Sequence, residues 1–194
     1  MENKIFTIKI ADLGISQLYI NREKLNGVAK WFDVSWVNEY EPLPVYDFGN
    51  GRYTLTDGHT RAYTMLKNGI QDVRVQLDLD EMITCDLGQR LYSTDIEWCN
   101  KYGMHGASDF ESRIIPNEQY SVLWLERCKR LYNLLSSDFS TDSLSKNFKD
   151  LLLYGANADL SEFYFDDCKG NLYLYKNGVL QEEGKARWQN AQDY

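Results

Sequence analysis

Residues 53–62 read Tyr-Thr-Leu-Thr-Asp-Gly-His-Thr-Arg-Ala, and this stretch decides how the first part of the chain folds. Residues 53–56 are β-prone and predict a strand. Asp57-Gly58 predicts a tight turn, because glycine adopts the left-handed backbone at little cost. A helix is expected from Thr60 to Lys67, with Asn68-Gly69 as its C-terminal stop. The stretch therefore predicts a strand, a turn and a helix in immediate succession.

The sequence on either side of this stretch predicts a mixed sheet. Alternating apolar residues indicate strands over 5–10 and 73–79. Residues 45–48 are expected to pair with 53–56 across the Asn50-Gly51 turn, a strong hairpin signal. Asn21 is a suitable N-cap for a helix that ends before the prolines at 42 and 44. The order strand, helix, hairpin, helix, strand is typical of a mixed α/β unit.

The pattern changes after about residue 81. Helical spacing of apolar residues is found over 91–102, 117–135 and 143–153, and a hairpin is expected at 163–165 and 172–175. The tail from Glu182 to Tyr194 is polar and is expected to be loosely held. We therefore predict an α+β protein. A mixed-sheet domain over residues 1–82 is followed by a mainly helical region with a terminal hairpin over residues 83–194.

The composition limits the function classes. The 194 residues are 43% hydrophobic and 14% aromatic, which is enough for a folded core and unlike a disordered chain. The formal net charge of −8 favours a protein partner over DNA, because binding to a phosphate backbone usually needs a basic excess. No signal-peptide core or long apolar run occurs, so we expect a cytoplasmic protein without a membrane segment.

The four cysteines, at positions 85, 99, 128 and 168, are widely separated. They form no Cys-x-x-Cys pair, and neither histidine lies at metal-ligand spacing from a cysteine. This arrangement argues against a zinc site. We expect reduced, structural thiols, as in cytosolic proteins.

The turn at residues 57–61 gathers groups that suit a phosphate ligand. A helix N-terminus offers free N–H groups and a positive dipole end, and Gly58 lets an anion approach the backbone. The forked guanidinium of Arg61 can bind phosphate oxygens, and Thr60 can cap the helix or donate its hydroxyl to the anion. His59 offers an acid, a base or a phosphate ligand, and Asp57 offers a metal ligand, a proton acceptor or a group that orients His59. The alternative is an ordinary turn pinned by Asp57, with His59 half-buried and hydrogen-bonded to a carbonyl.

Residues from about 8 to 79 resemble the ParB/sulfiredoxin superfamily. The resemblance rests on residues 15–20 and 44–47, and above all on 55–62 followed by Gly69 and residues 73–75. It implies a Gly-x-x-Arg turn at a helix N-terminus that binds nucleotide phosphates. The implied ligand is a nucleotide (ATP, ADP or CTP) with Mg²⁺, held through Gly58, His59, Thr60 and Arg61, with Asp57 as a metal ligand. No family is recognised in the C-terminal part.

Departures from the family pattern separate its branches. Sulfiredoxins carry a nucleophilic cysteine directly after the glycine, where this chain has His59, so a sulfinic-acid reductase is excluded. Chromosome-partition ParB proteins usually have Glu and Arg after the glycine, where this chain has His59 and Thr60, and no convincing helix-turn-helix follows. The Asp-Gly-His form looks closer to a branch that includes a free-serine kinase. That branch uses a glutamate near the start of the first helix as base, and Glu23 is the nearest counterpart; the alternative is a solvated helix-start carboxylate.

Two functions are compatible with these residues. The first is a nucleotide-dependent phosphoryl transferase or hydrolase, such as a small-molecule kinase or nucleotidase, with catalytic roles for His59, Asp57 and Glu23. The second is a non-catalytic module of phage or mobile-element origin that responds to nucleotide or binds a protein or DNA. His105 lies in a loop flanked by glycines, which either folds over residues 57–61 or is a plain connection.

Overall fold

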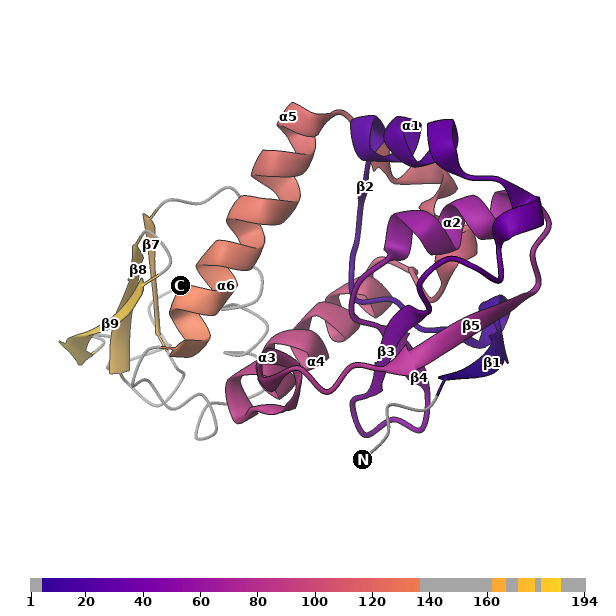
Figure 1. Cartoon of the computed structure of the whole chain (residues 1–194). Coiled ribbons are helices and arrows are strands. Elements are labelled where there is room, and N and C mark those ends of the chain that lie inside the picture. The colour runs from indigo at the N-terminus through magenta and orange to yellow at the C-terminus, as the bar shows by residue number, and fades with distance from the viewer. Residues whose placement is uncertain (1–4, 137–161, 167–170, 177–178, 186–194) are drawn as a thin grey trace. The chain divides into compact units, whose positions relative to one another are not determined.

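The computed structural model describes residues 5–136, 162–166, 171–176 and 179–185 (Figure 1). The chain divides into two compact units, Met1–Ser121 and Val122–Tyr194. Sheets and helices are both present, and the larger sheet is mixed, which confirms the expected α+β class.

The first unit is built on a four-stranded sheet with the strand order β1-β5-β3-β4. β1 is antiparallel to β5 and β4 is antiparallel to β3, whereas β3 and β5 run parallel. Parallel neighbours need a crossover connection, and helix α2 lies in the chain between them. The strands are β1 (Ile5–Lys9), β3 (Leu43–Asp47), β4 (Tyr53–Leu55) and β5 (Asp72–Leu77).

Helices α1 (Arg22–Trp31) and α2 (His59–Lys67) pack against each other, and α2 lies between α1 and the sheet (Figure 1). The prediction of Asn21 as N-cap is confirmed, because its side chain accepts the backbone N–H of Lys24 at 3.0 Å. The side of α2 that faces the core buries Ala62, Tyr63 and Met65. Burying such side chains stabilises the folded state by about 1.5–3 kcal/mol for each large one.

The strands contribute the other half of this core. In β3, buried Leu43 and Val45 alternate with half-buried neighbours. In β5, Val73 and Val75 are buried in the same alternating pattern. This period of two turns the buried side chains to one face of the sheet, which lies under α2 (Figure 1).

The first unit extends beyond the domain boundary that we expected at residue 82. Strand β2 (Ile20–Asn21) pairs in parallel with β6 (Ile114–Ile115), so the chain returns to the first unit after residue 82. Phe110 is fully buried and its ring lies against His59 and Tyr63. The helical elements of the first unit after residue 80 are α3 (Glu81–Thr84), α4 (Asp86–Lys101), η3 (Ala107–Ser112) and α5 (Asn117–Tyr120). Earlier in the chain, short 3₁₀ turns occur at Ile10–Asp12 and Val34–Trp36.

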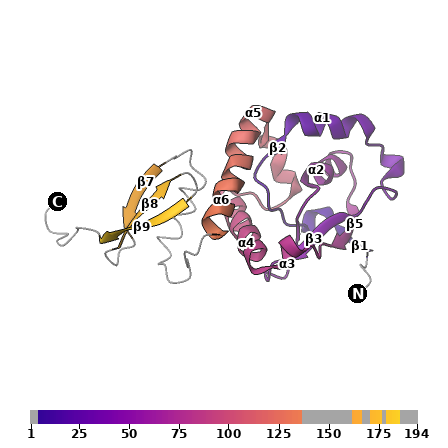
Figure 2. The same cartoon turned by 60° about the vertical axis from the view of Figure 1, so that its left-hand side comes forward.

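The second unit contains helix α6 (Glu126–Ser136) and a three-stranded antiparallel sheet (Figure 2). The expected hairpin is confirmed as β7 (Glu162–Asp166) and β8 (Asn171–Lys176). The expectation of a loosely held tail from Glu182 is wrong as far as Lys185, because β9 (Val179–Lys185) pairs with β8 as a third strand. The expected helix over 117–135 is found as α5, a π-helical segment (Ser121–Leu125) and α6. The helix expected over 143–153 lies outside the described residues.

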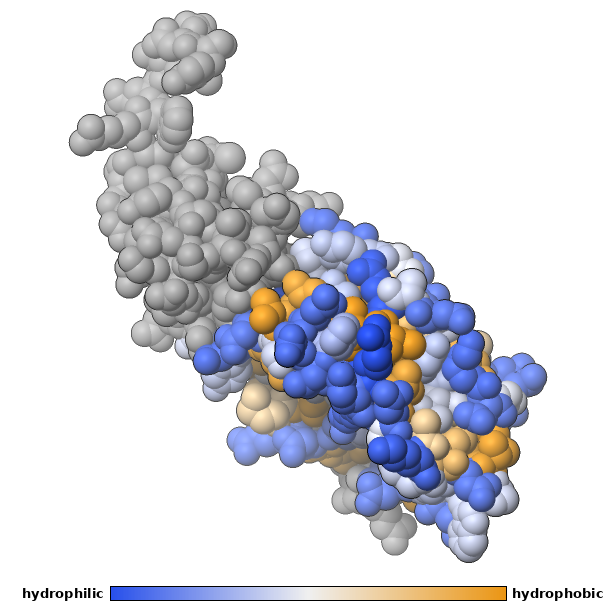
Figure 3. Space-filling model, turned by 90° about the horizontal axis from the view of Figure 1, so that it is seen from above, coloured by the Kyte–Doolittle hydropathy of each residue, from blue (hydrophilic) through white to orange (hydrophobic). Residues whose placement is uncertain are grey.

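No helix within the described ranges is both long and apolar enough to cross a membrane. Among the described residues seen in Figure 3, most of the surface is hydrophilic, with apolar residues in smaller groups. In the first unit, the last residue of α1 and the connection to β3 expose three large apolar side chains, Trp31, Val34 and Trp36.

Candidate functional site

The candidate site is the corner where β4 ends and α2 begins. Gly58 lies directly before α2 with φ +76°, in the left-handed region that favours glycine. Its carbonyl accepts the N–H of Ala62 at 2.8 Å, which closes the first helical turn. Because the residue before the helix is a glycine, no N-cap side chain satisfies the N–H groups of that turn. The predicted strand, turn and helix are therefore present.

Gly58 is also required by the space around it. A Cβ atom at this position would lie 2.9 Å from Cδ2 of Leu43 and 3.2 Å from Nη2 of Arg61. Nε of Arg61 would be 3.5 Å away. The guanidinium of Arg61 therefore lies against the glycine, at the start of the helix.

Arg61 connects this corner to the chain that precedes β3. Its Nη1 donates to the backbone carbonyl of Glu41 at 2.9 Å. Arg61 and Asp57 line an open cavity of about 600 Å³. The other lining residues come from around β3 and the end of β5, namely Glu41, Pro42, Pro44, Gln76, Leu77, Asp78, Leu79 and Asp80.

The cavity lining is acidic, with four carboxylates against one guanidinium. Two of these carboxylates already accept hydrogen bonds from the protein. Asp78 accepts the hydroxyl of Thr56 at 2.6 Å and the N–H of Asp80 at 3.2 Å, and Asp80 accepts the N–H of Met82 at 2.8 Å. Neither residue was predicted from the sequence; their signal is a position within three residues of the end of β5, the strand parallel to β3.

The side chains at this corner can be compared with the ligands that Mg²⁺ requires. The described ranges hold no group of three or more His, Cys, Asp or Glu side chains arranged to bind a metal ion. Asp57 is exposed and lines the cavity. Mg²⁺ is commonly held by one or two carboxylates together with phosphate oxygens and water. The residues present are compatible with the ion in that form, in which Asp57 would supply the protein ligand.

His59 faces the interior. It is 4% exposed, and its Nε2 accepts the backbone N–H of Ser16 at 3.2 Å. Because Nε2 uses its lone pair in this bond, the ring proton is on Nδ1. Burial is the main cause that lowers the pKa of His59 to about 4; the charge of Asp57 opposes this shift and that of Lys24 adds to it. His59 is therefore neutral near pH 7, and it is not among the residues that line the cavity.

The other predicted site residues lie in different surroundings. Thr60 is buried, and its carbonyl accepts the hydroxyl of Thr64 at 2.9 Å. Glu23 accepts the N–H of Asn117 at 2.9 Å, at the start of α5. Glu23 is not among the residues that line the cavity beside Arg61. The structure thus brings Asp57, Gly58 and Arg61 together and places Glu23 elsewhere.

His105 does not line the corner cavity either. Its Nδ1 lies 2.9 Å from Oδ1 of Asn100, and its backbone N–H donates to Asp109 at 2.7 Å. Burial raises the pKa of Asp109, but hydrogen bonds from the N–H groups of His105 and Gly106 and from Ser108 outweigh this and lower it. These hydrogen bonds fix the loop around His105 to η3. This arrangement agrees with a plain connection and not with a loop that folds over residues 57–61.

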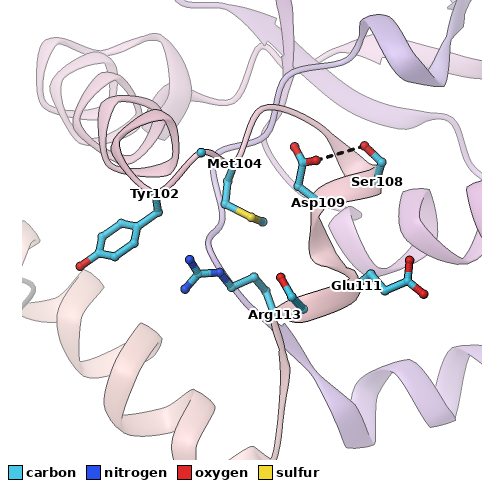
Figure 4. Close-up of a pocket in the computed structure, with 8 residues that line it drawn as sticks. Tyr102, Met104, Ser108, Asp109, Glu111 and Arg113 are labelled. Atoms are coloured by element: carbon cyan, nitrogen blue, oxygen red, sulfur yellow. Dashed lines mark hydrogen bonds between the residues drawn. The ribbon is translucent and has the colours of Figure 1, made fainter.

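A second cavity, of about 500 Å³, lies between the end of α4 and η3 (Figure 4). Its lining includes Tyr102, Met104 and Arg113. The guanidinium of Arg113 lies 5.3 Å from the ring centre of Tyr102 and 5.7 Å from that of Tyr19. This cluster was not predicted from the sequence. The pairing of β2 with β6 brings Tyr19 close to Arg113, although the two residues are far apart in the sequence.

No protein-family model matches the chain, and no curated protein matches its sequence. The structure is similar to that of protein Atu1540 from Agrobacterium tumefaciens, with a TM-score of 0.38 and 14% sequence identity. The match covers 81% of this chain and 93% of that chain. A similarity at this TM-score carries no argument about the family or the function of the chain.

Proposed function

We propose that the first unit is a ParB/sulfiredoxin-like domain that binds the phosphate groups of a nucleotide at the corner formed by residues 57–61. The observation that carries this proposal is the left-handed Gly58 at the start of α2, with the guanidinium of Arg61 against it. The corner borders a cavity of about 600 Å³, which falls in the size range of small-molecule sites.

Each part of the corner contributes to anion binding. The first N–H groups of α2 and the positive end of its dipole attract negative charge. Gly58 lets the guanidinium of Arg61 lie against the start of the helix, because a Cβ there would be only 3.2 Å from Nη2 of Arg61. Hydrogen bonds from a guanidinium to a phosphate are charge-assisted and about twice as strong as neutral ones. Arg61 would therefore supply the largest single contribution to binding.

The acidic lining makes a divalent cation part of the proposal. Carboxylates near a polyphosphate repel it, and a cation bridging the phosphate oxygens and Asp57 reduces this repulsion. ATP, ADP and CTP with Mg²⁺ are the expected ligands. If the bound nucleotide reacts, Asp57 is the carboxylate beside Arg61 that we propose as the proton acceptor for an attacking hydroxyl or water.

The positions of the other two catalytic candidates favour a binding module over an enzyme. The lone pair of His59 accepts the N–H of Ser16, and the carboxylate of Glu23 accepts the N–H of Asn117. A general base must reach the proton that it removes. We therefore propose nucleotide binding as the primary function. Phosphoryl transfer or hydrolysis of the bound nucleotide is the second candidate.

The test is thermal unfolding with ATP, ADP, CTP and GTP, each with Mg²⁺. A nucleotide at 100 times its Kd stabilises the protein by about 2.7 kcal/mol and raises the melting temperature measurably. Arg61→Ala should abolish this rise. Arg22→Ala, which removes an exposed guanidinium in α1, should retain it. The absence of a rise with all four nucleotides would refute the proposal.

A further inference from the structure

The segment from Asn38 to Pro42, here named the strap, runs into β3 and forms part of the cavity wall through Glu41 and Pro42. Two guanidinium groups hold its backbone carbonyls. Arg61 Nη1 donates to the carbonyl of Glu41 at 2.9 Å. Arg74 Nη1, from β5, donates to the carbonyl of Asn38 and lies 3.5 Å from that of Tyr40.

Arg61 faces the strap and the corner with different nitrogen atoms. Nη1 donates to the strap, whereas Nη2 and Nε are the atoms nearest to Gly58. A guanidinium is planar and rigid, and Nε and Nη2 form one of its two forks for a bidentate anion. A phosphate held by that fork leaves Nη1 on the carbonyl of Glu41. The anion and the strap can therefore be bound by Arg61 at the same time.

We propose that a phosphate bound at the corner tightens the strap over the cavity through Arg61. This inference rests on the proposed function and adds a coupling between ligand and backbone. Holding the carbonyl of Glu41 costs Arg61 part of its side-chain conformational freedom. An anion on the Nε–Nη2 fork fixes the side chain in advance, so the bond to the strap costs less entropy. The coupling is reciprocal, so a loosened strap weakens anion binding by the same factor.

The far end of the strap leads to a cluster of aromatic rings. The hydroxyl of Tyr40 accepts the N–H of Asp33 at 2.8 Å. Its ring lies 5.2 Å from that of Trp31 and 5.5 Å from that of Phe32. These contacts fix Tyr40 to residues 31–33, so we expect tightening at Glu41 to change residues 38–42 and not the aromatic cluster.

The test is amide hydrogen exchange of the full chain, measured by mass spectrometry with and without inorganic pyrophosphate and Mg²⁺. Pyrophosphate is expected to slow exchange in a peptide covering residues 38–42 several-fold. A peptide covering the hairpin turn at residues 48–52 serves as the internal reference and should change less. Thermal unfolding on the same samples reports whether pyrophosphate binds.

Two variants separate the coupling from general stabilisation. Arg61→Lys keeps the charge but lacks the fork, and it should lose the slowing at the strap. Arg74→Gln removes the other guanidinium that holds the strap and leaves residues 57–61 unchanged. It should exchange faster at residues 38–42 without ligand and should still be slowed by pyrophosphate.

The outcomes distinguish this inference from the function on which it rests. A thermal shift with unchanged exchange at residues 38–42 overturns the coupling and leaves phosphate binding intact. Equal slowing of the strap and the reference peptide also overturns it, because that is global stabilisation. If neither pyrophosphate nor any of the four nucleotides raises the melting temperature, both proposals are overturned.

Discussion

The backbone N–H of Ser16 donates to Nε2 of His59 at 3.2 Å, across 43 positions of sequence. The hydroxyl of Ser16 donates to the carbonyl of Leu55 at 2.7 Å, so the same residue also holds the end of β4. His59 thus joins the segment before α1 to the start of α2. This bond requires neutral His59, and it connects the stability of the corner to pH.

We expect the free energy of unfolding to fall as the pH drops from about 6.5 towards 4. The folded pKa of His59 is about 4 against 6.5 for an unperturbed histidine, so the unfolded chain binds a proton first as the pH falls. The stability is fully present above pH 6.5. A difference of this size is worth up to about 3 kcal/mol, at 1.36 kcal/mol per pKa unit.

Urea unfolding at pH 7, 5.5 and 4.5 measures this loss. His59→Gln keeps a hydrogen-bond acceptor but does not titrate in this range, so the fall should be smaller by about the contribution of His59. If the wild type and His59→Gln show the same pH dependence, the buried neutral state of His59 is refuted.

A second prediction concerns the backbone at the corner. Gly58→Ala should reduce the free energy of unfolding by about 1–3 kcal/mol, because a left-handed φ strains residues with a Cβ. The added methyl would also lie 2.9 Å from Leu43. Urea unfolding at neutral pH measures the effect.

Gly27→Ala is the matched control for this substitution. Gly27 lies within α1, and a Cβ there meets no atom within 4 Å. Alanine has a higher helix propensity than glycine, so this variant should be about 0.5–1 kcal/mol more stable than the wild type. Equal effects of the two substitutions would contradict the special role of Gly58.

The sequence predicted the local geometry of the corner because that geometry depends on neighbouring residues. Asn50-Gly51, Asp57-Gly58 and Asn68-Gly69 are turn or helix-end signals that act over a few positions, and all three glycines have positive φ. The alternation over residues 73–79 likewise predicted the burial of Val73 and Val75. These features need no information about distant parts of the chain.

The parts that the sequence did not predict depend on contacts between distant residues. The inward orientation of His59 follows from Ser16 and from Phe110, neither of which is near it in sequence. The position of Glu23 follows from Asn117, 94 residues away. The expected boundary at residue 82 rested on a change of pattern, whereas the pairing of β2 with β6 includes residues up to 115 in the first unit.

A third prediction distinguishes two alternative roles of Glu23, a catalytic base and a hydrogen-bond acceptor at the start of α5. The carboxylate accepts the N–H of Asn117, so Glu23→Gln should leave any nucleotide-induced rise in melting temperature unchanged. The melting temperature without ligand should fall slightly, because a neutral amide is a weaker acceptor at a helix start. If a turnover assay detects nucleotide hydrolysis, its rate should also be retained. Loss of turnover with intact binding would instead support Glu23 as a base.

The last prediction concerns the charge of Asp57, which lies beside Arg61 in an acidic cavity. Without a divalent cation, its carboxylate repels a phosphate, so Asp57→Asn should bind ATP more tightly than the wild type in the presence of EDTA. With Mg²⁺, the wild type gains a metal ligand that asparagine supplies poorly, so the order of affinities should reverse. Isothermal titration calorimetry under both conditions measures the four affinities. Asp72→Asn, an exposed carboxylate in β5 outside the cavity lining, is the control and should show the wild-type dependence on Mg²⁺. A Mg²⁺ dependence that Asp57→Asn does not alter would exclude Asp57 as the metal ligand while leaving Arg61 as the phosphate ligand.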